Sequence, residues 1–201
     1  MKNLKTLLFA LVAILAISSC SKKDDPVVVV PPPVNEEEVL TTVTLVLTPV
    51  GGGTTITLKS KDPDGDGPAA PVITGNNVPF ATNKTYNGEV SVLNESVTPT
   101  KNVSAEILTE ALDHQFFYQT TGNLPMFTYA TVAAEPTNYD TNGKPVGFKT
   151  VFVTTTAATG TLKITLRHQG DKTKPNVVNG DITNATGATD FEVEFSGLSV
   201  Q

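Results

Sequence analysis

The sequence contains no tryptophan and a single cysteine among its 201 residues, and aromatic residues make up only 6% of it. One cysteine cannot form a disulfide within the chain, so a folded domain must be stabilised by apolar burial and hydrogen bonds. The Cys…Trp…Cys spacing of antibody domains is therefore excluded. What remains is rich in Thr, Val, Gly and Pro, a composition that favours strands and turns over helices.

Sequence motifs of common enzymes are also missing. There is no GxSxG, HExxH, Walker or dinucleotide-binding GxGxxG pattern, although a Ser-His-Asp triad assembled from distant residues stays open. The formal charge of −6, without Lys/Arg clusters, argues against a nucleic-acid partner.

The N-terminus has the form of an exported lipoprotein leader. A short basic start, MKNLK, precedes the apolar run TLLFALVAILAISS, which is short for a membrane span. The run ends in Ile17-Ser18-Ser19-Cys20, which resembles a bacterial lipobox. That resemblance predicts cleavage of a signal peptide, residues 1–19, and a diacylglycerol on Cys20 that anchors the chain in a lipid bilayer. The alternative is an ordinary secretory leader with a chance cysteine.

Residues 20–38 form a predicted tether behind the lipidated cysteine. Its start, SKKDDP, resembles the Lys- and Asp-rich export signal of Bacteroidota-type lipoproteins, which implies the outer membrane, with the cell surface favoured over the periplasmic face. The prolines of PVVVVPPPVNEEE favour extended polyproline II, and the three glutamates 36–38 are most simply its solvated end. A plain solvated tether is the alternative to an export signal.

From residue 39 to residue 201 the pattern is that of strands. VLTTVTLVLTP alternates apolar and polar residues, the glycines 51–53 predict a hairpin turn, and Phe191, Val193 and Phe195 alternate with glutamates. About nine short strand candidates indicate a mainly β fold, an antiparallel Ig-like two-sheet β-sandwich.

One segment, residues 103–113, predicts a short helix. An apolar stripe is expected there, with Asn102 or Ser104 as the N-cap; its members are Ile107, Leu108, Ala111 and Leu112. Such a helix would cross between the sheets or close one end of the sandwich.

The stretch DPDGDG is a candidate calcium loop. Asp62, Asp64 and Asp66 alternate as oxygen ligands before Gly67, as in a DxDxDG loop. The twelfth loop position is Ile73 rather than glutamate, which excludes an EF-hand. Two interpretations of this stretch remain open: a calcium-stabilised hairpin loop and an ion-free acidic turn.

His114 and His168 are the only histidines. If they met, together with Glu110 or Asp113, they could bind zinc or copper or line a ligand site. His168 shares strand parity with Leu162, Ile164 and Leu166 and is expected to point inward. Because spacing alone gives no pairing in space, the plainer interpretation is favoured: a hydrogen-bonded pair at the core edge, or two histidines that never meet.

Most of the chain resembles a group of small, largely uncharacterised, β-rich outer-membrane lipoproteins of Bacteroidota. The resemblance rests on SSCSKKDD, NEEEVLTTVTLVLTP, DPDGDG, DHQFFYQ and TLKITLRHQGDK. It implies a location and a fold rather than a reaction. Relatives can carry a type 1 periplasmic-binding-fold label, which requires two α/β lobes, whereas the strand-rich pattern here favours the sandwich.

Three functions are consistent with these observations. The first is a non-enzymatic lipoprotein that binds a small ligand or metal, or assists a TonB-dependent outer-membrane transporter. The second is a structural or adhesive surface module, and the third is a hydrolase with an unrecognised site.

Native protein purified from mildly solubilised outer membranes tests the anchor and the transporter together. We expect mass analysis to find Cys20 as a diacylated N-terminus, and a TonB-dependent transporter to be recovered with the protein. Intact residues 1–19 would contradict lipidation, and repeated recovery of the protein alone would contradict the transporter.

Overall fold

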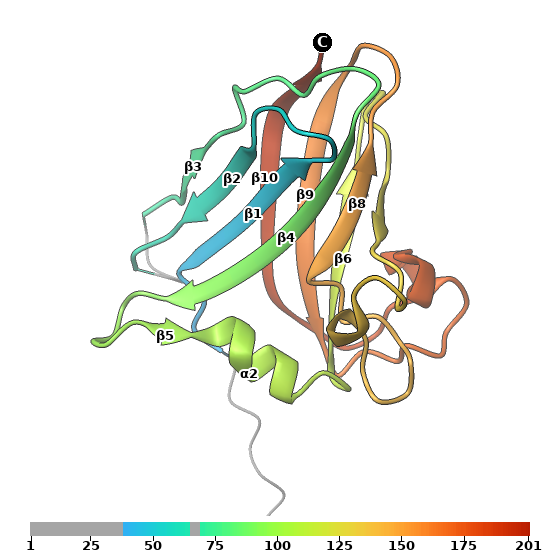
Figure 1. The fold of residues 1–201 in the computed structure, drawn as a ribbon. Coiled ribbons are helices and arrows are strands. Elements are labelled where there is room, and N and C mark those ends of the chain that lie inside the picture. The colour runs from blue at the N-terminus through green and yellow to red at the C-terminus, as the bar shows by residue number, and fades with distance from the viewer. Residues whose placement is uncertain (1–37, 65–68) are drawn as a thin grey trace, which may run out of the picture. The chain divides into compact units, whose positions relative to one another are not determined.

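The computed structural model describes residues 38–64 and 69–201, which form two antiparallel sheets and one α-helix. Figure 1 shows β10 and β9 passing behind β1 and β4, and β6 behind β8, with the C-terminus at the end opposite the helix. The expected mainly β, two-sheet sandwich with one short helix is confirmed. The leader, Cys20, most of the predicted tether and Asp66 lie outside the described residues.

The larger sheet has the order β3–β2–β1–β4–β8–β7, with β5 paired to β4. Its strands are β1 (Thr42–Pro49), β2 (Ile56–Lys61), β3 (Val72–Thr74), β4 (Thr85–Asn94), β5 (Lys101–Asn102), β7 (Phe127–Tyr129) and β8 (Lys149–Val153). The smaller sheet has the order β10–β9–β6, with strands β6 (His114–Thr120), β9 (Ala158–His168) and β10 (Ala188–Val200). The helices are α2 (Val103–Thr109) and the 3-10 turns η1 (Pro136–Asn138), η2 (Val177–Asn179) and η3 (Ile182–Asn184).

The β1–β2 hairpin follows the sequence prediction. Val43, Leu45 and Leu47 are buried, as the alternation indicated. The glycines 51–53 all have positive φ, from 78° to 133°, in the loop that returns the chain to β2. A side chain at these positions would strain the turn, which explains three consecutive glycines.

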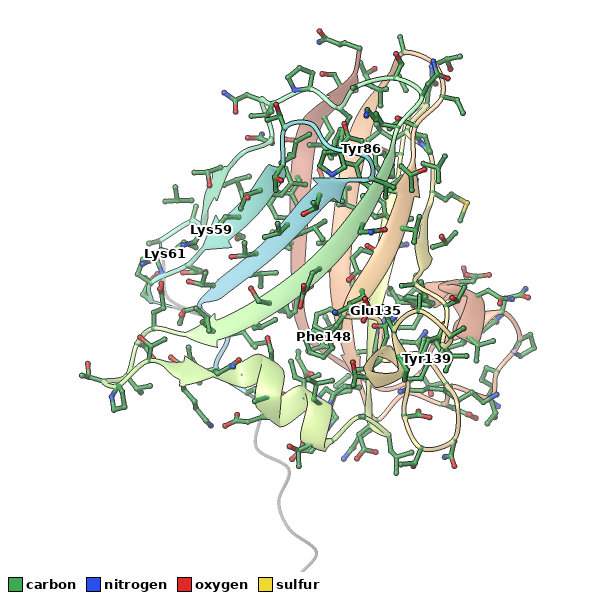
Figure 2. The ribbon with its side chains drawn as sticks, in the orientation of Figure 1. Lys59, Lys61, Tyr86, Glu135, Tyr139 and Phe148 are labelled. Carbon is green, nitrogen blue, oxygen red and sulfur yellow. The ribbon has the colours of Figure 1, made fainter. Side chains whose placement is uncertain are left out.

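The core fills the space between the sheets with aliphatic and aromatic side chains. At one end Phe80 packs edge-on against Tyr86 and Phe152, with ring centroids 5.3 and 5.0 Å apart. Phe116 packs against Phe148 at 4.8 Å, and Figure 2 places Phe148 nearer the helix end than Tyr86. These contacts compensate for the absence of tryptophan by spreading aromatic burial along the sandwich.

Two irregularities interrupt the pairing of β10 with β9. The register shifts between Thr189 and Phe191 and again between Phe195 and Leu198. Each shift inserts one extra residue in β10, which is the count expected of a β-bulge. A bulge changes the face to which nearby side chains point, so simple alternation fails along this strand.

The helix is shorter than expected and buries a narrower stripe. It ends at Thr109, and the predicted apolar residues Leu108 and Leu112 are 42% and 50% exposed. Only Val103 and Ile107, four residues apart, are buried within it, because two turns present a single line of side chains to the core. In the described ranges no helix is long and apolar enough to cross a membrane.

Neither predicted cap bonds the helix in the expected way. Asn102 occupies the N-cap position without a side-chain hydrogen bond to the helix. The Ser104 hydroxyl instead accepts a 2.7 Å hydrogen bond from the Val92 amide of β4. The helix is therefore positioned by the neighbouring strand rather than by its own cap.

A buried lysine fixes the turn that follows α2. The Lys172 ammonium donates to the Ala111 carbonyl at 2.7 Å and to the Asp140 carboxylate at 3.0 Å. The two side chains are 6% and 1% exposed. Burial lowers the pKa of Lys172, and the nearby Asp140 carboxylate opposes that shift. This contact holds residues 110–113 against the loops of the second half of the chain.

Replacement of this lysine tests the contact. We expect Lys172→Met to lower the free energy of unfolding by about 3–5 kcal/mol, because it leaves the Asp140 carboxylate buried without its cation. The matched change Lys101→Met, in an exposed pair with Glu106, should cost under about 1 kcal/mol. Urea unfolding of both variants provides the measurement; equal losses would contradict the role of burial.

Candidate metal centre

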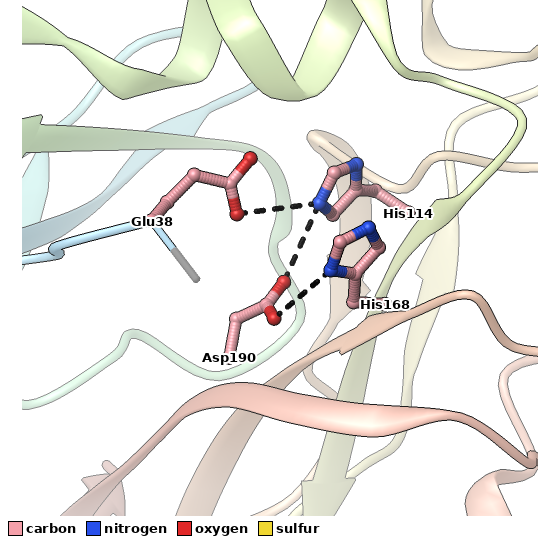
Figure 3. A group of neighbouring side chains, drawn as sticks. All are labelled: Glu38, His114, His168 and Asp190. Atoms are coloured by element: carbon pink, nitrogen blue, oxygen red, sulfur yellow. Dashed lines mark ion pairs between the residues drawn. The ribbon is translucent and has the colours of Figure 1, made fainter. Parts of the chain in front are cut away.

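Four titratable side chains converge at one end of the smaller sheet (Figure 3). They are Glu38, His114, His168 and Asp190, and each offers one ligand atom within 4.8 Å of the others. They come from four separate segments: the residues before β1, the start of β6, the end of β9 and the start of β10. The cluster is therefore a product of the tertiary fold.

Strand register brings the histidines together. His114 is the direct partner of His168 in the β6–β9 ladder. Their rings stack with centroids 4.4 Å apart and an interplanar angle of 14°. His114 is fully buried and His168 is 4% exposed, so the predicted inward direction of His168 is confirmed.

Asp190 lies between the two rings because of the first β10 bulge. It is the extra residue between Thr189 and Phe191. One carboxylate oxygen is 3.4 Å from His114 Nε2 and the other is 3.4 Å from His168 Nδ1. The side chain is only 1% exposed. The bulge thus turns a carboxylate that alternation would place outside toward the histidines.

Glu38 completes the cluster from the segment that precedes β1. Its Oε2 lies 3.4 Å from His114 Nε2, and its side chain is 12% exposed. The sequence indicated a solvated tether end at this position. In the structure, the carboxylate faces the cluster instead (Figure 3).

A main-chain contact fixes the tautomer of His114. Its Nδ1 lies 3.1 Å from the Glu110 carbonyl, which can only accept, so Nδ1 carries the proton. In the neutral ring, Nε2 then presents its lone pair to the carboxylates of Glu38 and Asp190. Metal-ligating histidines are oriented by the same kind of outer contact.

Several polar atoms at the centre of the cluster meet one another only in ion-pair contacts of 3.4 Å. Among the described residues, buried atoms without a hydrogen-bond partner include Glu38 Oε2, His114 Nε2 and both carboxylate oxygens of Asp190. Buried polar atoms left in this state cost about 1–3 kcal/mol each, and more when charged. Two carboxylates and an imidazole lone pair that converge in this way fit a divalent cation placed between them.

The carboxylates change the protonation of His114. Burial alone lowers its pKa, but the Asp190 carboxylate, the Glu110 carbonyl and the charge of Glu38 outweigh burial. The net result is a pKa raised above the ordinary value. Without a metal, protonation of His114 therefore supplies positive charge next to the two carboxylates.

A cleft of about 400 Å³ opens onto the carboxylate side of the cluster. It is lined by residues 38–41 and 189–193, together with Val43, Ser60, Asp62 and Pro71. Glu38 and Asp190 belong to its lining, whereas the two histidines do not. The cluster is thus closed behind the imidazoles and reaches the cleft through its carboxylates.

Sequence reasoning found two of these four residues. The prediction that Glu110 contributes its side chain is wrong, because that side chain is exposed and only its carbonyl contacts His114. The helix ends before His114, so Glu110 and His114 do not share a helical face. Asp113 is also exposed. Of the two plainer interpretations, that of histidines that never meet is wrong, since the rings stack, whereas that of a paired set of histidines at the core edge stays open beside the metal site.

The predicted calcium loop begins at the same cleft, but none of its described residues belongs to the four-residue cluster. Asp62 follows β2 and lines the cleft, and the Asp64 carboxylate accepts a 3.2 Å hydrogen bond from the Ala69 amide. The strands on either side, β2 and β3, pair as a hairpin, with Lys61 opposite Val72. Since Asp66 is outside the described residues, calcium binding here stays a prediction.

Comparisons with family models, with curated proteins and with solved structures found no match to this chain.

The raised pKa of His114 predicts how stability changes with pH when metal is removed. A pKa higher in the folded state than in the unfolded state stabilises the fold below the unfolded value. That contribution should disappear as the pH rises from about 6.5 through the raised pKa. Urea unfolding in EDTA should show this loss in the wild type and a flatter profile in His114→Asn. A wild-type profile that rises relative to the variant would contradict the assignment.

Proposed function

We propose that this protein is a non-enzymatic, lipid-anchored protein that captures a divalent transition-metal ion of the zinc class. The observation that carries the proposal is the convergence of ligand atoms from Glu38, His114, His168 and Asp190, where Glu38 Oε2, His114 Nε2 and both Asp190 oxygens are buried without a hydrogen-bond partner. The sequence indicated a ligand-binding protein, and this metal ion is the ligand that we propose for it.

The donor set favours a particular kind of cation. Imidazole nitrogen suits zinc, copper, iron and nickel, whereas calcium and magnesium prefer an all-oxygen shell. The two carboxylates of Glu38 and Asp190 balance the charge of a divalent ion, which lowers the cost of burying it. Two nitrogens and two oxygens also match the four-coordinate shell that zinc adopts.

Capture rather than catalysis is supported by the number of protein ligands. Catalytic zinc sites have three protein ligands and keep one position for water or substrate, while sites that only hold the ion are filled by four. Glu38, His114, His168 and Asp190 supply four.

The predicted anchor gives metal capture a location. A lipid on Cys20 and a polar, proline-rich tether would hold the site outside the outer membrane or at its inner face. A metal-binding module so placed could supply ions to a TonB-dependent transporter in the same membrane, the partner that we propose.

Titration calorimetry with Zn²⁺ and with Ca²⁺ tests the site. We expect one zinc ion per chain, and a gain of about 2.7 kcal/mol in unfolding free energy at a zinc concentration 100 times the Kd. His168→Gln and Asp190→Asn should each lose most zinc affinity. Asp64→Asn, in the separate acidic loop, is the matched control and should retain it.

Two outcomes would contradict this function. One is no zinc binding by the wild type after dialysis from EDTA. The other is zinc binding that survives Asp190→Asn but fails in Asp64→Asn, which would move the site to the acidic loop.

A further inference from the structure

We infer that Glu38 is the exchangeable ligand of this metal centre, and that an incoming neutral nitrogen donor of the imidazole class takes its place through the cleft. His114, His168 and Asp190 form the ligand core that remains. The inference rests on the proposed metal-binding function and adds the route and chemistry by which the ion is handed over.

The three core ligands belong to one rigid unit. They lie on the neighbouring strands β6, β9 and β10 of the smaller sheet. The ladder pairs His114 with His168, and the β10 bulge directs Asp190 to both rings. Their side chains are 0%, 5% and 1% exposed. None of them can leave the site without disturbing this sheet.

Glu38 is held differently. It precedes β1, a strand of the other sheet, and among the described residues its ion pair within the cluster is with His114. Main-chain hydrogen bonds with Leu93 and Asp62 fix Thr41, three residues further on. Val39, the next residue after Glu38, is 54% exposed. A change in the backbone of residues 38–40 could therefore withdraw the Glu38 carboxylate and leave β1 in place.

The cleft determines which ligand replaces it. Four carboxylates line it, from Glu38, Asp62, Asp190 and Glu192, and no lysine, arginine or histidine is among its described lining residues. That charge attracts hydrated cations and repels anionic donors such as carboxylates and phosphates. Within this largely polar lining, the half-buried side chains of Leu40 and Phe191 offer apolar surface against which a flat, neutral ring can pack.

The exchange step is a simple substitution at the metal. The lone pair of the incoming imidazole nitrogen forms a metal–nitrogen bond, and the bond from Glu38 Oε2 to the metal breaks. The Glu38 carboxylate then lies in the solvated cleft, and no proton or electron is transferred. The five-coordinate state needed on the way is one that zinc-class ions adopt.

Cobalt(II) serves as the probe, because its visible absorption reports the ligands. The mature chain is loaded with Co²⁺, and release to excess EDTA is followed in the wild type, Glu38→Gln, Glu38→Asp and Glu194→Gln. We expect Glu38→Gln to bind one Co²⁺ and, at an unchanged association rate, to release it at least about 10-fold faster than the wild type, since even outer contacts to metal ligands are worth about 10- to 100-fold in affinity. Glu194→Gln, on the exposed face of β10, should match the wild type, and Glu38→Asp should be intermediate.

A second titration tests the incoming donor. Imidazole added to the Co²⁺-loaded wild type should change the visible spectrum with saturation, and should do so at lower concentration than azide. Imidazole should also bind more tightly to Glu38→Gln, since the bond from residue 38 to the metal, which imidazole must displace, is weaker in this variant.

Each outcome bears on the inference. Release from Glu38→Gln no faster than from Glu194→Gln would overturn it, and so would complete loss of Co²⁺ binding in Glu38→Gln, which would place Glu38 in the core. Tighter binding of azide than of imidazole would overturn the donor class. Failure of the wild type to bind Co²⁺ would instead remove the metal-binding function itself, and the inference with it.

Discussion

The antiparallel pairing of β6 with β9 is the constraint on which the site depends. It sets His114 opposite His168, so their rings stack at 4.4 Å in the interior. A shift of the register by one residue would turn one imidazole to the opposite face. The bulge at Asp190 then adds a carboxylate from the third strand, and the buried Lys172 contact holds the turn that leads into β6. Structure far from the cluster thus determines its geometry.

The sandwich could be predicted from the sequence because residue alternation and turn motifs each lie within a short stretch of the chain. The alternation of β1, the glycine turn and the inward parity of His168 can each be recognised within a few residues. The pairing of His114 with His168 could not be recognised in this way, because the register between distant strands is a property of the whole sheet. Asp190 shares parity with Glu192 and Glu194, and only the bulge, which leaves no clear sequence signal, reverses its direction. Glu38 is one of three consecutive glutamates, and the sequence does not indicate which of them lies near the histidines.

The cluster also links the predicted tether to the folded domain. Glu38 stands at the boundary between them, and its carboxylate faces His114. Two carboxylates near one imidazole repel each other unless a proton or a metal lies between them. Occupancy of the proposed metal site would therefore be coupled to the conformation of the domain's first residues, and a bound ion would contribute to folding there.

X-ray absorption spectroscopy of the zinc-loaded protein would identify the ligands of the bound ion. We expect four nitrogen and oxygen ligands at about 2.0–2.2 Å, with outer-shell scattering from two imidazoles. A shell of oxygen ligands alone, without imidazole scattering, would contradict a metal centre built on His114 and His168.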